Sequence, residues 1–143
     1  MEEKVAYIEQ RVGANAEAIV IPVRIENIGS TRHFEGSALW DTGAARTTIA
    51  QCVADTLQLD TLPFGLMNTP AGSVPCNVGA VLVFPGNVKR FVPVATAVMN
   101  GARRACDVII GMDVIRRGDM ILRHEGDSLI FRFDFGKEFS TRK

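Results

Sequence analysis

Apolar and β-branched residues recur along the chain in short runs that are separated by turn-forming residues. The first clear run covers residues 18–26 and reads Ala-Ile-Val-Ile-Pro-Val-Arg-Ile-Glu, and the next covers residues 33–40. Both compositions are typical of strands, and Pro22 restricts the first one to an edge or a bulge. The segment Asn27-Ile28-Gly29-Ser30 predicts a turn between them.

Strand-like runs also make up most of the remaining chain. The helical spacing of Val53, Ala54 and Leu57 predicts a short helix within residues 50–59, and residues 112–117 predict one or two helical turns. The other segments expected to be extended are residues 47–49, 62–67, 74–84, 90–99, 107–111, 120–123 and 128–135. Many short strands with turns about every ten residues favour an all-β barrel or sandwich.

The last run carries the clearest alternation of apolar and polar residues. Its period of two places four apolar side chains on one face, namely Leu129, Phe131, Phe133 and Phe135. The chain is 143 residues long and 47% hydrophobic, which favours one domain with a single core. We expect residues 1–17 to be an arm or strand outside the core, 18–136 the folded domain, and 137–143 a polar tail.

Charge and cysteine content narrow the possible functions. Sixteen basic and sixteen acidic residues cancel, so the sequence lacks the electrostatic footprint of a protein that binds nucleic acid or a membrane surface. No apolar run reaches the length of a signal peptide or a membrane span. The three cysteines are widely spaced and form no CxxC, which predicts reduced thiols and a cytoplasmic location.

Two apolar strands end in residues that can carry chemistry. The run 33–40 leads directly into Asp41-Thr42-Gly43, and the run 108–110 leads into Gly111 and a helical turn. An acidic residue at the end of an apolar strand is either a turn-former or a group held for catalysis. Taken alone, Asp-Thr-Gly does not decide between these two interpretations.

Together, the two features resemble the half-site of the retropepsin-like aspartic proteases, which is hydrophobic-hydrophobic-Asp-Thr/Ser-Gly-Ala followed well downstream by hydrophobic-hydrophobic-Gly. The matching residues are Ala38 to Ala44 and Ile109-Ile110-Gly111. The segments 43–49 and 110–115 are similar to Asp-Ser-Gly-Ala…Thr-Ile and Leu-Gly-Leu-Asp-Met-Leu of the cellular branch typified by the DNA-damage-inducible proteases. The resemblance spans residues 18 to 135. It implies a single-lobe acid-protease barrel with one or two short helices, functional as a symmetric homodimer.

The resemblance also implies the reaction. Peptide hydrolysis by this route needs two carboxylates that share one proton, one acting as general base on water and the other as general acid. The chain has no second Asp-Thr-Gly. We therefore expect the catalytic pair to be Asp41 from each of two copies, with a peptide or protein as substrate and no cofactor.

Residues around Asp41 are expected to support it. The resemblance implies that the Thr42 hydroxyl bonds the partner's loop and that Gly43 lets the backbone turn and approach the substrate. Ala44 leaves room beside the substrate, and Thr47 is expected to bond within the loop. Viral relatives place an acidic residue where this chain has Ala45, so tight viral-style gripping of the substrate backbone is not expected.

The turn-forming segment between the two motifs is the expected flap over a bound peptide. Its residues are Asn68, Thr69, Pro70, Ala71, Gly72 and Ser73. Pro70 lacks an amide and stiffens the tip. The alternative for this segment is an ordinary exposed hairpin loop.

The remaining polar residues of interest are expected to have structural roles. Asp113 is expected to form a cap or a salt bridge, and Arg46 either meets an acidic group across an interface or is solvated. His33 and His124 are far apart and lack metal-ligand spacing, so no metal is expected. No serine or cysteine nucleophile elbow and no phosphate-binding glycine loop occurs.

Two other interpretations stay open beside the protease. A non-catalytic peptide-binding or dimerisation module on the same fold is favoured by Ala45, Pro70 and Trp40, which could crowd the approach to the catalytic pair. The other is a purely structural β domain. The segments 128–135 and 3–15 are candidates for packing between subunits.

Overall fold

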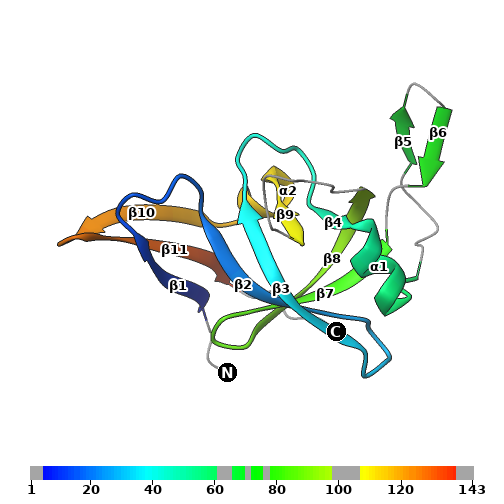
Figure 1. The fold of residues 1–143 in the computed structure, drawn as a ribbon, viewed down its shortest axis with the longest axis horizontal. Helices are drawn as coiled ribbons and strands as arrows, with labels where there is room; N and C mark the ends of the chain where they lie inside the picture. The colour runs from blue at the N-terminus through cyan, green and yellow to red at the C-terminus, as the bar shows by residue number, and fades with distance from the viewer. Residues whose placement is uncertain (1–4, 61–65, 70–71, 76–77, 98–106, 138–143) are drawn as a thin grey trace.

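The computed structural model describes residues 5–60, 66–69, 72–75, 78–97 and 107–137. These residues form a closed six-stranded barrel, a three-stranded sheet, a separate two-stranded hairpin and two short helices (Figure 1). The predicted all-β barrel with little helix is therefore confirmed.

The barrel joins strands that are distant in the sequence. Its strands, in spatial order, are β2 (Val20–Glu26), β3 (His33–Trp40), β9 (Val108–Ile110), β4 (Thr48–Ala50), β8 (Val88–Ala97) and β7 (Val78–Phe84). Strand β3 pairs with β9 and β4 pairs with β8 in parallel, whereas the other neighbours run antiparallel.

Alternation along the strands fills the barrel. In β2, Ile21, Val23 and Ile25 are buried, while Pro22 is exposed and Arg24 is half-buried between them. Because successive side chains of a strand point to opposite faces, the three β-branched residues line the interior. Pro22 lies within β2 itself, where it pairs with Ser37 of β3.

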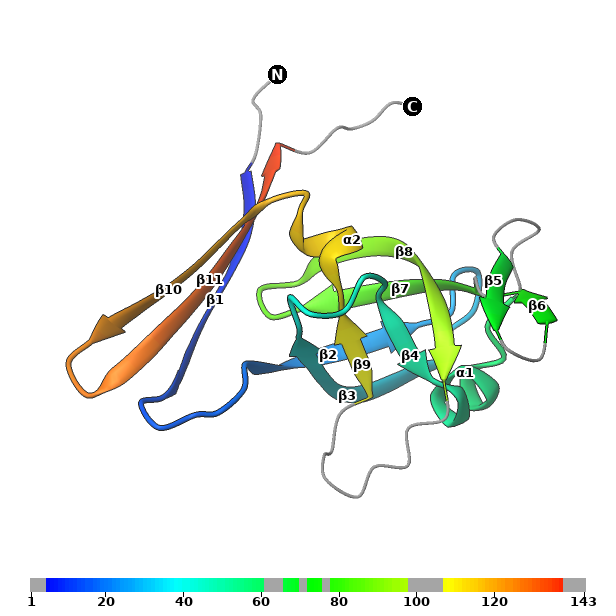
Figure 2. The same cartoon turned by 90° about the horizontal axis from the view of Figure 1, so that it is seen from above.

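The two ends of the described chain meet in a second sheet, which we call the terminal sheet. It contains β1 (Val5–Gly13), β11 (Ser128–Lys137) and β10 (Asp119–Glu125), with β11 in the middle. Figure 2 shows this sheet reaching past the barrel on one side.

In the terminal sheet, Phe131 and Phe133 are completely buried, as the predicted alternation required. The prediction that the N-terminal segment lies outside the core is wrong, because Ile8 of β1 is only 1% exposed and belongs to the core.

Trp40 connects the terminal sheet to the barrel. Its ring centroid lies 5.8 Å from that of Phe84 in the barrel, 5.1 Å from Phe131 and 5.0 Å from Phe133. The side chain is 5% exposed. Its indole N–H has no hydrogen-bond partner among the described residues. Trp40 thus belongs to the core and does not crowd the approach to Asp41.

The helices and the hairpin follow the predictions with shifted limits. Helix α1 covers Gln51–Leu57 and α2 covers Met112–Ile115. Strand β5 (Leu66–Thr69) pairs with β6 (Gly72–Pro75), with Thr69 opposite Gly72, so the turn is narrower than the predicted segment 68–73. The extended run predicted over residues 74–84 is divided, because β6 ends at Pro75 and β7 begins at Val78.

Some predictions fall outside the described residues, namely those for Pro70, Ala71, residues 62–65 and 98–99, and the tail after Lys137. Neither helix in the described part of the chain has the length and apolar character that a membrane-spanning helix requires.

Candidate active site

Asp41 lies at the point where β3 leaves the barrel. Its backbone N–H donates a hydrogen bond of 2.9 Å to the carbonyl of Ile110, which continues the pairing of β3 with β9 by one step. Its carbonyl accepts a 3.1 Å bond from the N–H of Ala44, which closes a tight turn. The side chain is half-buried and the next two residues, Thr42 and Gly43, are exposed.

The backbone of Gly43 holds the carboxylate of Asp41. The N–H of Gly43 donates a hydrogen bond of 2.8 Å to Oδ1 of Asp41. A Cβ at position 43 would lie 3.2 Å from that same oxygen, which is tighter than nine in ten real Cβ contacts. Gly43 does not have a positive φ. The close approach to the carboxylate, rather than an unusual turn, is therefore what favours glycine here.

The two sequence motifs meet in space. Leu39 pairs with Ile109 and Trp40 pairs with Ile110, in parallel. Beyond these pairs, Gly111 packs directly against the loop that follows Asp41: a Cβ on Gly111 would lie 2.7 Å from the carbonyl carbon and oxygen of Arg46 and 2.9 Å from the carbonyl oxygen of Ala44. The structure therefore brings the Asp41 loop and the Ile109-Ile110-Gly111 motif into contact.

Thr47 is the buried connection between this loop and α2. It is 0% exposed, and its hydroxyl donates a 2.7 Å hydrogen bond to Oδ1 of Asp113 while accepting one of 3.0 Å from the N–H of Gly111. The N–H of Thr47 also donates to both carboxylate oxygens of Asp113, at 2.9 and 3.0 Å. Thr47 therefore bonds outside its own loop, where the sequence predicted a bond within it.

Asp113 is more important to the site than the sequence indicated. The predicted salt bridge exists, because Nε of Arg46 lies 4.0 Å from Oδ2 of Asp113 in the same chain. The N–H groups of Met112 and Asp113 also donate to the carbonyls of Ala44 and Ala45, at 2.8 and 3.2 Å. Helix α2 is thereby attached to the Asp41 loop through both side-chain and backbone bonds.

Comparison with solved structures found two proteins that are similar to this chain. A retropepsin-like aspartic protease from Rickettsia conorii is similar over 94% of this chain and 98% of its own, with a TM-score of 0.54 and 15% sequence identity. The chain has the retropepsin-like fold. The retroviral protease-like domain of Ddi1 from Leishmania major is similar over 82% of this chain and 94% of its own, with a TM-score of 0.43 and 16% identity. No protein-family model matches the sequence, and no curated protein matches it.

The retropepsin-like fold was predicted from the motifs and is confirmed at the level of architecture. The expected flap residues that can be placed lie in β5 and β6, a hairpin that projects from the barrel near α1 (Figure 1). Among the described strands, β5 and β6 pair only with each other. The flap role of this hairpin stays a prediction.

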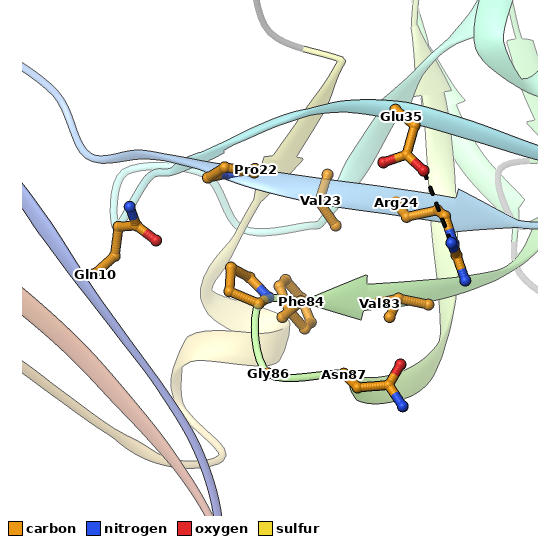
Figure 3. Close-up of a pocket in the computed structure, with 10 residues that line it drawn as sticks. Gln10, Pro22, Val23, Arg24, Glu35, Val83, Phe84, Gly86 and Asn87 are labelled. Atoms are coloured by element: carbon orange, nitrogen blue, oxygen red, sulfur yellow. Dashed lines mark ion pairs between the residues drawn. The ribbon is translucent and has the colours of Figure 1, made fainter.

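A surface hollow of about 400 Å³ lies apart from Asp41. It is formed between Gln10 of β1 and residues of β2, β3, β7 and the turn after β7, and Asp41 is not among its lining residues (Figure 3). On the wall formed by β2 and β3, Nη1 of Arg24 lies 3.8 Å from Oε2 of Glu35, its cross-strand neighbour (Figure 3). The hollow is therefore a feature of the barrel wall to which Asp41 does not contribute.

The described residues contain no group of three or more histidine, cysteine, aspartate or glutamate side chains arranged to hold a metal ion. His33 in β3 and His124 in β10 are both exposed. At Asp41 the described residues provide a half-buried carboxylate that accepts a hydrogen bond from the backbone N–H of Gly43.

Proposed function

We propose that this chain is an aspartic endopeptidase that hydrolyses peptide bonds through a water molecule activated by Asp41 from each of two copies. The observation that carries the proposal is the Asp41 carboxylate itself. It is half-buried at the end of β3, its Oδ1 accepts the 2.8 Å hydrogen bond from Gly43, and the adjacent loop residues are exposed to a ligand. The retropepsin-like fold supports the same conclusion.

The reaction requires a second carboxylate. The ionised Asp41 takes a proton from water as the water oxygen attacks the scissile carbonyl carbon, and the protonated Asp41 of the other copy gives its proton to the carbonyl oxygen. The tetrahedral intermediate then collapses: the C–N bond breaks as the amine nitrogen takes the proton that the first Asp41 received from water, and a hydroxyl of the intermediate returns a proton to the second Asp41 as the new carboxyl group forms. Since the chain has one Asp-Thr-Gly, a symmetric homodimer supplies both acids.

The surrounding residues then have defined roles. The Gly43 N–H fixes the orientation of the carboxylate, and the small Ala44 leaves room beside it. In this proposal the hydroxyl of Thr42, which is exposed in the single chain, bonds the loop of the other copy. The β5–β6 hairpin closes over the bound peptide and excludes water from the reacting bond.

We place the enzyme in the cytoplasm. Cys52, on α1, is exposed and unpaired, which suits a reducing compartment.

One observation favours a second function, a peptide-binding or dimerisation module with little or no activity on the same fold. Ala45 is exposed in the Asp41 loop and carries no acidic group that could hold a substrate backbone. A module of this kind binds peptides without cleaving them, so binding with no product distinguishes it from the protease.

The test is incubation of the protein with a diverse peptide mixture from acidic to neutral pH, with products identified by mass spectrometry. We expect cleavage by the wild-type protein and none by Asp41→Asn or Asp41→Ala. Asp127→Asn, in the exposed β10–β11 turn, is the matched control and should cleave normally. Cleavage that survives either Asp41 substitution excludes the proposed mechanism.

A further inference from the structure

Strand β9 holds part of the candidate site in place although it has only three residues. The carbonyl of Ile110 accepts the backbone N–H of Asp41, and Gly111 packs on the loop that follows Asp41. The strand lies between β3 and β4 in the barrel wall (Figure 2). The position of Asp41 therefore depends on the register in which β9 pairs with β3.

The side chains of β9 do not fix that register by themselves. All three are apolar and β-branched, namely Val108, Ile109 and Ile110. A shift by one residue would still turn a branched apolar side chain toward the interior, so the three residues alone oppose the shift only weakly. The same shift would move the Ile110 carbonyl by about 3.3 Å and break its hydrogen bond with Asp41.

Asp107 makes the contacts that are specific to one register. It directly precedes β9, and its carboxylate oxygen Oδ2 accepts a hydrogen bond of 3.0 Å from the backbone N–H of Ser37 in β3. Its own N–H donates to the carbonyl of Ser37 at 2.9 Å, and its carbonyl accepts the N–H of Ala50 in β4 at 2.9 Å. Asp107 is thus bonded to the strands on both sides of β9.

Gly36 leaves the space that this carboxylate occupies. A Cβ at position 36 would lie 2.5 Å from Oδ2 of Asp107, a distance that real Cβ atoms essentially never show. The φ angle of Gly36 is not positive, so backbone conformation does not require a glycine there. The carboxylate of Asp107 and the missing side chain of Gly36 are therefore matched across the two strands.

We propose that Asp107 is a positioning residue for the catalytic carboxylate. It fixes the register of β9 at the end where Ser37 lies, and β9 presents the Ile110 carbonyl to Asp41 at the other end. Three residue steps along a strand span about 10 Å, so Asp107 acts through β9 and not on a substrate. The catalytic meaning of this role rests on the proposed function, whereas the effect on the register does not.

Amide hydrogen exchange of the native protein, followed by NMR, tests the register directly. Asp107→Ala removes the acceptor of the Ser37 N–H, and we expect the amides of Ser37 and Asp41 both to exchange about tenfold faster. Asp107→Asn keeps an oxygen at the same place, so both amides should exchange within about threefold of the wild-type rate. Asp127→Ala, in the exposed β10–β11 turn, is the control and should change neither amide.

Two results of this experiment overturn the inference. Faster exchange at Ser37 with no change at Asp41 means that Asp107 affects only its own end of β9. Equal acceleration in the pairing of β7 with β8, which β9 does not join, means that the substitution lowers stability generally and does not release β9.

Gly36→Ala tests the same contact without changing Asp107. The added methyl group displaces the carboxylate, so the Asp41 amide should again exchange about tenfold faster. In the double variant with Asp107→Ala the carboxylate is absent, and the exchange rate should stay within about threefold of that of Asp107→Ala alone. Effects that multiply to about a hundredfold mean that the two residues act independently, which contradicts the matched pair.

Peptide cleavage provides a second measurement, with a peptide that the wild-type protein cleaves in the mixture. Asp107→Ala should lower kcat about tenfold with KM nearly unchanged, because it displaces Asp41 and leaves the substrate contacts in place. Asp107→Asn should keep kcat within about threefold of the wild-type value. A raised KM with unchanged kcat overturns the positioning role. A wild-type protein that cleaves no peptide contradicts the proposed function alone, since the exchange measurements need no substrate.

Discussion

The hydroxyl of Thr47 donates a hydrogen bond of 2.7 Å to the carboxylate of Asp113, 66 positions away in the chain. The same hydroxyl accepts the N–H of Gly111, so a single buried side chain joins the Asp41 loop, the second glycine motif and α2. This connection reinforces the bonds that the N–H groups of Met112 and Asp113 donate to the carbonyls of Ala44 and Ala45 in the same loop.

Thr47→Val should destabilise the fold. The isosteric change removes the donor to Asp113 and leaves the buried N–H of Gly111 without its acceptor, at a cost of about 1–3 kcal/mol in unfolding free energy. Thr47→Ser keeps the hydroxyl and should lose much less. Urea denaturation followed by circular dichroism measures both. Equal stability of the valine and serine variants would show that these hydrogen bonds contribute little.

Gly111→Ala should destabilise the protein by overpacking. The added methyl group meets the backbone of Arg46 at 2.7 Å and of Ala44 at 2.9 Å, and backbone cannot move aside as a flexible side chain can. We expect a loss of about 1–3 kcal/mol or more in thermal or urea unfolding. Gly13→Ala is the control, because nothing lies within 4 Å of a Cβ at Gly13. Two variants of similar stability would contradict the close packing of the motifs.

Trp40→Ala should loosen the attachment of the terminal sheet. Removing an indole that contacts Phe84, Phe131 and Phe133 leaves a cavity, and we expect the free energy of unfolding to fall by about 3–5 kcal/mol. Trp40→Phe keeps an aromatic ring and removes a buried N–H that has no partner among the described residues, so it should cost far less. Urea unfolding compares the two. A small loss for the alanine variant, similar to that of the exposed control Phe91→Ala, would argue against this role for Trp40.

The local pattern of apolar and polar residues was sufficient to predict the positions of most strands of the barrel. The strand predicted over residues 33–40 is β3 with the same limits, because a turn precedes it and Asp41 ends its apolar run. The division of residues 74–84 into β6 and β7 was missed. The run is apolar almost throughout, so hydrophobic pattern alone did not mark the break after Pro75.

The candidate site was only partly predictable, because many of its contacts join residues that are distant in the sequence. The resemblance grouped the two motifs into one half-site, and the packing of Gly111 on the backbone of Arg46 and Ala44 was seen only in the structure. The bonds between Thr47 and Asp113 and the packing of Trp40 on Phe131 and Phe133 join residues far apart in the sequence. Periodicity reports which face of an element is buried and not which distant residue covers it, so these contacts required the structure.

The central claim is that the catalytic pair consists of Asp41 from two copies, and a subunit-mixing experiment tests it most directly. Wild-type and Asp41→Asn proteins are combined in varying ratios at constant total concentration, allowed to exchange subunits, and assayed for peptide cleavage. Since only dimers with two Asp41 carboxylates are active, an equal mixture should retain about a quarter of the wild-type activity. Activity that falls in simple proportion to the wild-type fraction, leaving about half in the equal mixture, would show that each chain acts alone and contradict the shared catalytic pair.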